Sequence, residues 1–309
     1  MSESSKMNFH ELMSLYKEYN DTFEALYTPR TNNEEMLDKI CNDIKINLIN
    51  TKYFEPSDIL KILGSLQKYN NRYDESYWYI FKKIYEEFRP DHINGIPFVF
   101  DYRVYKEYGI WLNQRNQKLS GKLKIVKPSA IIQAIMNDDI VTFKSFTERE
   151  DFDKNDVLDA PIIFEKTNLS LLEACCYYGA TKCFSLLREK FDLEITKRCL
   201  KLSILNGNYG LVKECLKVVE PDDDCMENAI ISHNIALVTF LMIEYELTIN
   251  LYYCGLYNSL QAFFVYLDQT NDIKKCFIYS PSFNILSLCQ YFLDHGANIG
   301  CPKVCLAQT

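Results

Sequence analysis

Cysteine is the residue type in this chain with the widest choice of chemistry. Twelve occur in 309 residues, and eleven of them lie between Cys175 and Cys305. Thiols can form disulfides, bind zinc or act as nucleophiles, but no two here form a CxxC pair. The nearest metal-binding pattern is His295 with Cys301 and Cys305, whose spacing in CPKVC is one residue too wide. We therefore interpret the cysteines as small apolar core residues and predict no metal and no cofactor.

The histidines and carboxylates show no catalytic spacing either. None of the four histidines has a Ser, Cys or carboxylate placed as in a nucleophile–base pair. The aspartates at 222–224 lack the alternation of a calcium loop, and no glycine-rich phosphate-binding loop occurs. We predict that the chain has no catalytic residues. The alternative that stays open is an enzyme whose site lies in the N-terminal part of the chain, with the second half of the chain recruiting its substrate.

The charge balance argues against two classes of partner. A formal net charge of −8 does not suit binding to nucleic acid or to an anionic membrane, both of which favour basic proteins. The basic stretch at 118–127 has no interleaved aromatic residues and is typical of a solvated linker. The uncharged stretches at 247–267 and 276–293 contain polar residues with Gly or Pro, so each predicts two short helices rather than a membrane span. Because the first residues lack an apolar signal core, we expect a cytoplasmic protein.

The first 115 residues predict a bundle of about five helices, because apolar residues recur at helical spacing. The clearest segments are FHELMSLYKEY, MLDKICNDIKINLI, DILKILGSLQKY and SYWYIFKKIYEEF. Ser57, after Pro56, is a candidate helix cap, and a helix that begins near Asp74 should end before Pro90. The polar and basic residues 116–127 predict a linker, which places a second domain at 128–309.

The second domain repeats one short pattern. Small or apolar residues are followed by a residue suited to a tight turn and then by an amphipathic run such as LVKECL. Successive turn residues are separated by 41, 28, 26, 25 and 26 positions, the first gap being widened by an insertion at 148–168. Two helices of about eight to ten residues and two turns fill such a unit, so we predict six stacked helical hairpins. The turn residues are Asp138, Gly179, Gly207, His233, Asn258 and Asn284.

The register of these units resembles the ankyrin repeat. Its early Leu, small pair and turn Gly correspond to Leu172, Cys175-Cys176 and Gly179, and YFLDHGANI is similar to the ankyrin ending. Together with AIMNDDIVTFKSF, AIISHNIALVTFLMIEY and YLDQTND, these segments resemble a domain of unknown function that precedes ankyrin arrays in the large ankyrin-protein set of parabasalid protists. The resemblance implies an ankyrin-like solenoid and binding to another protein, with no known activity.

The chain departs from the ordinary ankyrin pattern in three respects. The TPLH segment that caps the first helix of a repeat is absent, so other residues must fix the helix starts. Pro281 occupies a small-residue position and should end or kink its helix. The last amphipathic run carries an apolar face with few residues after it, which predicts either self-association through the C-terminal repeat or a chain shortened relative to longer relatives. That face consists of Leu286, Leu288, Tyr291 and Phe292.

The fold class predicted is all-α, with an N-terminal helical bundle (1–115) followed by an ankyrin-like α-solenoid of short helical hairpins (128–309). We expect a non-catalytic protein–protein interaction module or adaptor whose protein partner contacts the first helices of the repeats. In that register five residues line the predicted groove. They are Tyr177, Asn228, Ile231, Tyr253 and Leu256.

Overall fold

The computed structural model describes residues 8–29, 31–121, 128–159 and 168–297, and these are mostly helical, which confirms the all-α prediction. The N-terminal elements are α1 (Phe9–Leu15), α2 (Lys17–Tyr27), α3 (Glu34–Ile44), the π-helical turn η1 (Lys45–Ile49), α4 (Pro56–Leu66), the 3-10 turn η2 (Asn71–Tyr73), α5 (Asp74–Phe88), α6 (Phe98–Tyr108) and α7 (Gln114–Leu119). The later elements are α8 (Ala130–Met136), α9 (Ile140–Thr147), β1 (Val157–Asp159), β2 (Asn168–Ser170), α10 (Leu171–Tyr178), α11 (Thr181–Phe191), α12 (Lys197–Asn206), α13 (Tyr209–Leu216), α14 (Asp223–Ile231), α15 (Ile235–Glu244), α16 (Leu251–Leu256), α17 (Leu260–Thr270), α18 (Ile273–Tyr279), the 3-10 turn η3 (Ser280–Phe283) and α19 (Leu286–Asp294).

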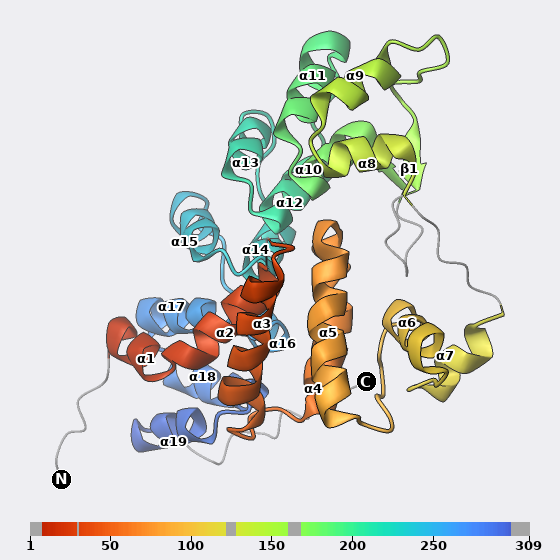
Figure 1. Cartoon of the computed structure of the whole chain (residues 1–309). Helices are drawn as coiled ribbons and strands as arrows, with labels where there is room; N and C mark the ends of the chain where they lie inside the picture. Colours follow the sequence, from red (N-terminus) through yellow and green to blue (C-terminus); the bar gives the residue numbers. More distant parts are fainter. Residues whose placement is uncertain (1–7, 30, 122–127, 160–167, 298–309) are drawn as a thin grey trace.

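Helices α8 to α19 pair into the six predicted hairpins, from α8–α9 to α18–α19. The first helix of each hairpin contacts the first helix of the next, and we call these helices (α8, α10, α12, α14, α16 and α18) the inner helices. The second helices are the outer helices. Figure 1 shows the stack descending from α8–α9 at the top to α18–α19 at the bottom.

The six turn residues chosen as markers of the repeat all have left-handed backbone conformations, as the pattern predicted. This conformation costs Gly nothing and is tolerated by Asn and Asp, which explains the residue types found there. The φ angles are 49° at Asp138, 72° at Gly179, 75° at Gly207, 50° at His233, 54° at Asn258 and 58° at Asn284.

Side-chain caps take the place of the missing TPLH segment. At α10, Ser170 accepts a hydrogen bond from the backbone N–H of Glu173, and the Glu173 carboxylate accepts one from the Ser170 N–H. This reciprocal arrangement satisfies two backbone donors that a helix start leaves unpaired. The other inner helices are capped by Ser129, Thr196, Asp222, Asn250 and Asp272.

Two local features differ from the sequence expectation and one agrees with it. Ser57 is not the cap of α4: the helix begins at Pro56, whose fixed φ suits the first helical position. Strand β1 of the insertion pairs antiparallel with β2, which begins at the last residue of the insertion, and Leu158 lies opposite Leu169; helical periodicity did not predict this pair. As predicted, Pro281 interrupts its helix, because α18 ends at Tyr279 and a 3-10 turn follows.

Aromatic side chains fill the interior of the N-terminal helices. Phe23, Phe81 and Phe100 are fully buried, and the Phe81 and Phe100 ring centroids are 5.1 Å apart. Pairs at this separation add to the stabilisation from burial itself. Helix α7 extends to Leu119, inside the predicted linker 116–127, and residues 122–127 lie outside the described ranges.

The N-terminal helices lie along the side of the repeat stack, next to the inner helices (Figure 1). Tyr16 packs on Phe264 of α17, with ring centroids 5.9 Å apart, and Tyr19 packs on Phe283 of η3 at 6.5 Å. The buried hydrophobic residues of the two parts form a single cluster. Helices from the start of the chain therefore pack against the last two hairpins of the stack.

Gly255 allows α16 to approach η3 closely. An added Cβ would lie 2.5 Å from the Cβ of Ser282, closer than side chains pack. We expect Gly255→Ala to lower the free energy of unfolding by about 2 kcal/mol, because a close-packed interior accommodates a new methyl group only by shifting backbone. Urea unfolding should show that adding Ser282→Gly recovers most of this loss.

Gly121→Ala is the matched control for this prediction, since nothing lies within 4 Å of its added Cβ. If Gly255→Ala were as stable as Gly121→Ala, the close approach would not limit the packing of the last two hairpins.

Candidate functional site

We call the face formed by the inner helices the inner face, and one row of equivalent residues shows how its burial changes along the stack. Tyr177, Leu205, Ile231 and Leu256 each lie two positions before a turn residue, on α10, α12, α14 and α16. Tyr177 and Ile231 are each only 4% exposed and Leu205 is partly buried, whereas Leu256 is 51% exposed. The row is therefore buried or partly buried on α10, α12 and α14, which we call the closed part of the inner face, and exposed on α16, which we call the open part.

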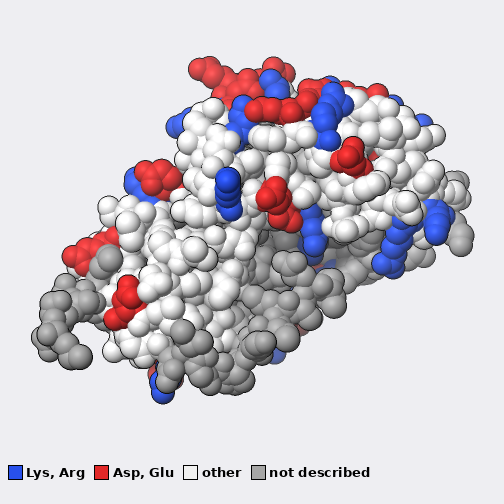
Figure 2. Space-filling model, turned by 90° about the horizontal axis from the view of Figure 1, so that it is seen from below, with Lys and Arg blue, Asp and Glu red and all other residues white. Residues whose placement is uncertain are grey.

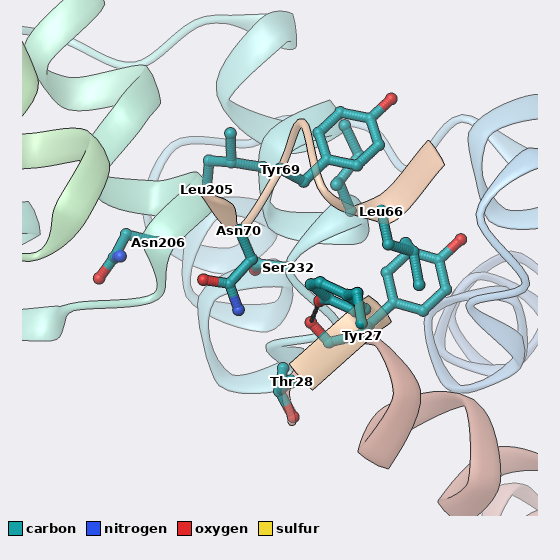
Figure 3. Close-up of a pocket in the computed structure, with 10 residues that line it drawn as sticks. Tyr27, Thr28, Leu66, Tyr69, Asn70, Leu205, Asn206 and Ser232 are labelled. Carbon is teal, nitrogen blue, oxygen red and sulfur yellow. Dashed lines mark hydrogen bonds between the residues drawn. The ribbon is translucent and has the colours of Figure 1, made fainter. Parts of the chain in front are cut away.

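The closed part is covered by the chain's own N-terminal helices. The Tyr177 hydroxyl donates a hydrogen bond of 2.8 Å to the backbone carbonyl of Lys68, just after α4. Ile231 borders a cavity of about 20 Å³ together with Tyr27 of α2 and Leu66 of α4, and Figure 3 shows Tyr27 and Leu66 facing this space. A cavity of this size holds about one water molecule, so the two surfaces fit closely.

Tyrosine hydroxyls add polar contacts along the same interface. Such bonds matter because a buried hydroxyl without a partner is costly. Three of them join the N-terminal helices to the last repeats. They are Tyr19 to the Asn258 side-chain oxygen (3.2 Å), Tyr69 to the Tyr257 hydroxyl (3.3 Å) and Tyr16 with the Ser287 hydroxyl (3.3 Å).

His233 occupies both the turn and the interface. Its ring stacks on Tyr27, with centroids 4.0 Å apart and an interplanar angle of 28°, and its Nε2 lies 2.8 Å from the Tyr257 carbonyl. Burial in this contact lowers the pKa of His233 to about 4, which the hydrogen bond to Tyr257 only partly offsets. The imidazole is therefore neutral at neutral pH.

We expect His233 to make the protein less stable in mild acid. Between pH 6.5 and pH 4 the unfolded chain binds a proton that the folded chain does not, so stability falls as the pH falls through this window. The contribution lost between pH 7 and pH 4.5 is about 2 kcal/mol. Urea unfolding at several pH values measures it.

The matched variant is His233→Asn, because Asn occupies the same turn position in the next two repeats. It should flatten the pH dependence in this window by about 2 kcal/mol. An unchanged slope would assign the acid sensitivity to other groups.

The other three predicted groove residues lie on α14 and α16. Asn228 on α14 donates a hydrogen bond of 3.2 Å to the Lys201 carbonyl, and Tyr253 and Leu256 lie on α16. Tyr252, 48% exposed, extends the same surface. Tyr253 and Leu256 thus lie together on α16 and Asn228 is partly buried on α14, whereas Tyr177 and Ile231 contact the N-terminal helices instead of solvent.

Glu227 is a member of this surface that the sequence reasoning missed. Its Oε1 accepts a hydrogen bond of 3.2 Å from the Tyr257 hydroxyl, and the Tyr253 hydroxyl also donates to its carboxylate. That contact raises the pKa of Tyr253. The repeat pattern could have identified Glu227. It lies six residues before the turn residue of its repeat, and Tyr252 on α16 occupies the equivalent position in the next repeat.

The cysteines are core residues, as predicted: all ten in the described ranges are free thiols and nine are buried. Three of these thiols come from two neighbouring repeats and still meet in space, although their separation along the sequence does not suggest it. Cys176, Cys199 and Cys215 converge between α10, α12 and α13. Their mutual contacts raise the pKa of Cys176, while hydrogen bonding to Cys176 lowers that of Cys199. Cys301 and Cys305, considered with His295 as zinc ligands, lie outside the described residues.

The predicted apolar face at the end of the stack is mostly buried. Leu288 and Phe292 are fully buried and Tyr291 is 6% exposed, because α19 turns them toward neighbours such as Phe263. Leu286 alone of that set is open, at 87% exposure. Figure 2, viewed from below, shows few charged side chains over this end of the molecule. Self-association through the C-terminal repeat stays a prediction.

The two uncharged stretches form two short helices each, as predicted. Within the described residues no helix has the length and apolarity to cross a bilayer.

No group of His, Cys, Asp or Glu in the described residues is arranged to hold a metal ion. A cleft of about 330 Å³ lies between Asn70, Arg72 and Tyr73 of the N-terminal part and the turns at Gly179 and Gly207.

Comparison with known families gives one match. Residues 191–266, from the end of α11 into α17, match a family described as Domain of unknown function (DUF3447). No curated protein and no solved structure matches the chain.

Proposed function

We propose that this protein is a non-catalytic interaction module that binds a protein partner on the open part of the inner face. The observation that carries the proposal is the exposure of Leu256. Its equivalents Tyr177 and Ile231 are buried against the N-terminal helices and Leu205 is partly buried, whereas Leu256 and Tyr252 present apolar surface to solvent. Exposed apolar and aromatic residues next to polar ones are typical of protein-binding surfaces.

The resemblance to ankyrin repeats supports this assignment. Proteins built from stacked helical hairpins present extended surfaces rather than enclosed reaction sites. The left-handed turns recur at the positions that the ankyrin register marks, and the match at 191–266 lies within the stretch that resembles the domain found ahead of ankyrin arrays. We infer an ankyrin-like solenoid of the parabasalid type, with the N-terminal helices as an added part.

A reducing compartment suits the cysteines of this protein. Ten buried or partly buried thiols lie in the described ranges without a disulfide among them. Disulfides are rare where glutathione keeps thiols reduced, so we propose a cytoplasmic location.

The test places a photoreactive amino acid at position 256 of the full chain and irradiates it in the native cell. We expect a covalent adduct with another protein. The matched control is the same amino acid at position 243, because Ile243 is 67% exposed on the outer helix α15. Equal labelling at both positions, or labelling at neither, would contradict a partner at the inner face.

A further inference from the structure

Hydrogen bonds and ring contacts join Glu227 of α14 to a group of tyrosine side chains. Glu227 of α14 accepts a hydrogen bond from the Tyr257 hydroxyl, and the Tyr257 hydroxyl in turn accepts one from the Tyr69 hydroxyl at 3.3 Å. Tyr253 stacks on Tyr257 at 6.2 Å with an interplanar angle of 20°. Tyr252 meets Tyr253 edge to face at 5.4 Å. The carboxylate is thereby held in place beside a series of aromatic rings.

This series runs from a buried end to an open end. Tyr257 is tied to the N-terminal helices through Tyr69, Tyr253 is partly buried, and Tyr252 is 48% exposed. Leu256 lies four residues after Tyr252, on the same face of α16, and is 51% exposed. We call Glu227, Tyr252, Tyr253 and Leu256 the tyrosine–glutamate surface.

The aromatic faces at the open end carry no cation of the chain itself. Several other tyrosine rings have a Lys ammonium above them, within about 6 Å of the centroid, the range in which a cation is attracted to a ring. In the described residues no Lys or Arg lies over Tyr252 or Tyr253 in this way. The rings already occupied include Tyr69 by Lys68, Tyr79 by Lys83, Tyr102 by Lys106 and Tyr266 by Lys275.

The carboxylate of Glu227 is likewise not neutralised by a described basic residue. Lys201 occupies the position of α12 that Glu227 occupies on α14. Its ammonium group pairs with Asp222 and Asp224 and not with Glu227. The hydroxyls that contact Glu227 are neutral donors. An exposed aromatic face beside an uncompensated carboxylate attracts a cation and repels an anionic ligand.

We propose that the tyrosine–glutamate surface binds a basic segment of the partner protein. In this arrangement one Arg or Lys side chain lies over the rings of Tyr252 and Tyr253 with its charge toward Glu227, and an apolar side chain of the segment packs on Leu256. An Arg suits the site best, because its planar guanidinium stacks on aromatic rings and forms hydrogen bonds with a carboxylate in the same plane. The inference rests on the proposed function and specifies the chemistry of the partner.

The experiment uses the full chain and a labelled hexapeptide, acetyl-Leu-Arg-Lys-Leu-Arg-Lys-amide, with fluorescence anisotropy as the readout. We expect binding that weakens several-fold when the salt concentration is raised from about 50 mM to about 300 mM. The same peptide with Glu in place of every basic residue should not bind. Glu227→Gln keeps the oxygen that accepts from Tyr257 and removes the charge, so it should weaken binding about tenfold.

Tyr252→Leu separates the aromatic contribution from apolar area. It should weaken binding about fivefold, because leucine keeps a hydrophobic side chain and lacks the negative ring face. The matched controls are Tyr209→Leu, 48% exposed on the outer helix α13, and Glu214→Gln on the same helix. Both should leave peptide affinity unchanged, and urea unfolding should show that all four variants are folded.

Two results would overturn the inference: equal peptide affinity of wild type, Glu227→Gln and Tyr252→Leu, or equal binding of the acidic peptide. Failure of the proposed function looks different. If crosslinking from position 256 captures a partner equally in wild type and Glu227→Gln, the interaction module stands and the basic-segment inference fails. If the peptide binds in a Glu227-dependent way and no crosslink forms, the site chemistry stands and the proposed function fails.

Discussion

Removal of residues 1–127 is expected to cause the protein to aggregate. The repeats that remain would expose Tyr177 and Ile231, both 4% exposed in the whole chain, together with the partners of Tyr16 and Tyr19 on the last two hairpins. Contiguous apolar surface of this kind is rarely tolerated on a soluble monomer. Light scattering and binding of a hydrophobic dye to the fragment 128–309 measure the effect.

The same experiment tests the prediction of two domains at 1–115 and 128–309. Co-expression of residues 1–127 as a separate chain is the control, and we expect it to restore a soluble complex by covering the inner helices. A fragment 128–309 that is monomeric, and that unfolds at the same urea concentration as the whole chain, would show that the repeats fold independently of the N-terminal helices.

Asp101→Ala is expected to lower the free energy of unfolding by about 3–4 kcal/mol. Asp101 is fully buried on α6, and its carboxylate accepts hydrogen bonds from the backbone N–H of Leu112 (2.7 Å), that of Asn113 (3.1 Å) and the Asn116 amide (2.9 Å). Burial raises the pKa of Asp101, and these three bonds oppose that shift. Alanine leaves the backbone N–H groups of Leu112 and Asn113 without this acceptor, each at a cost of about 1–3 kcal/mol. The Asn116 amide keeps only its hydrogen bond of 3.0 Å to the Ile96 carbonyl.

The isosteric variant Asp101→Asn is the matched control for this prediction. It keeps one side-chain oxygen and fills the same volume, so its loss of stability should be about half that of alanine. Urea unfolding monitored by tryptophan fluorescence is suitable, because Trp111 lies in the loop that Asp101 holds. A loss below about 1 kcal/mol for alanine would mean that water satisfies the three donors.

The repeat pattern was predictable because its determinants are local. A left-handed turn every 25 to 28 residues requires Gly, Asn, Asp or a tolerated substitute such as His233, and these residue types are visible without any knowledge of packing. Helix interruption at Pro281 followed from its missing backbone donor. The burial of the cysteines followed from their place among apolar residues.

The covering of the inner face was not predictable from periodicity. Tyr177 and Leu256 occupy equivalent positions, and nothing in either repeat indicates that one contacts the N-terminal part and the other does not. An apolar stripe on an N-terminal helix looks the same whether it packs within its own bundle or on a distant repeat. Tyr19 does both, meeting Phe23 at 4.8 Å and Phe283 at 6.5 Å.

The pairing of the first helices with the last repeats has a consequence during synthesis. Tyr16 contacts Ser287, which is 271 residues later in the chain. At about 5–20 residues per second, the ribosome takes on the order of 15 to 50 s to produce that partner after α2 has emerged. Throughout this interval α2 can pack on its neighbours in the bundle, such as Phe54, whereas Tyr16 and Tyr19 lack their partners on the last repeats. We therefore expect docking of the earliest helices on the repeats to be among the last steps of folding.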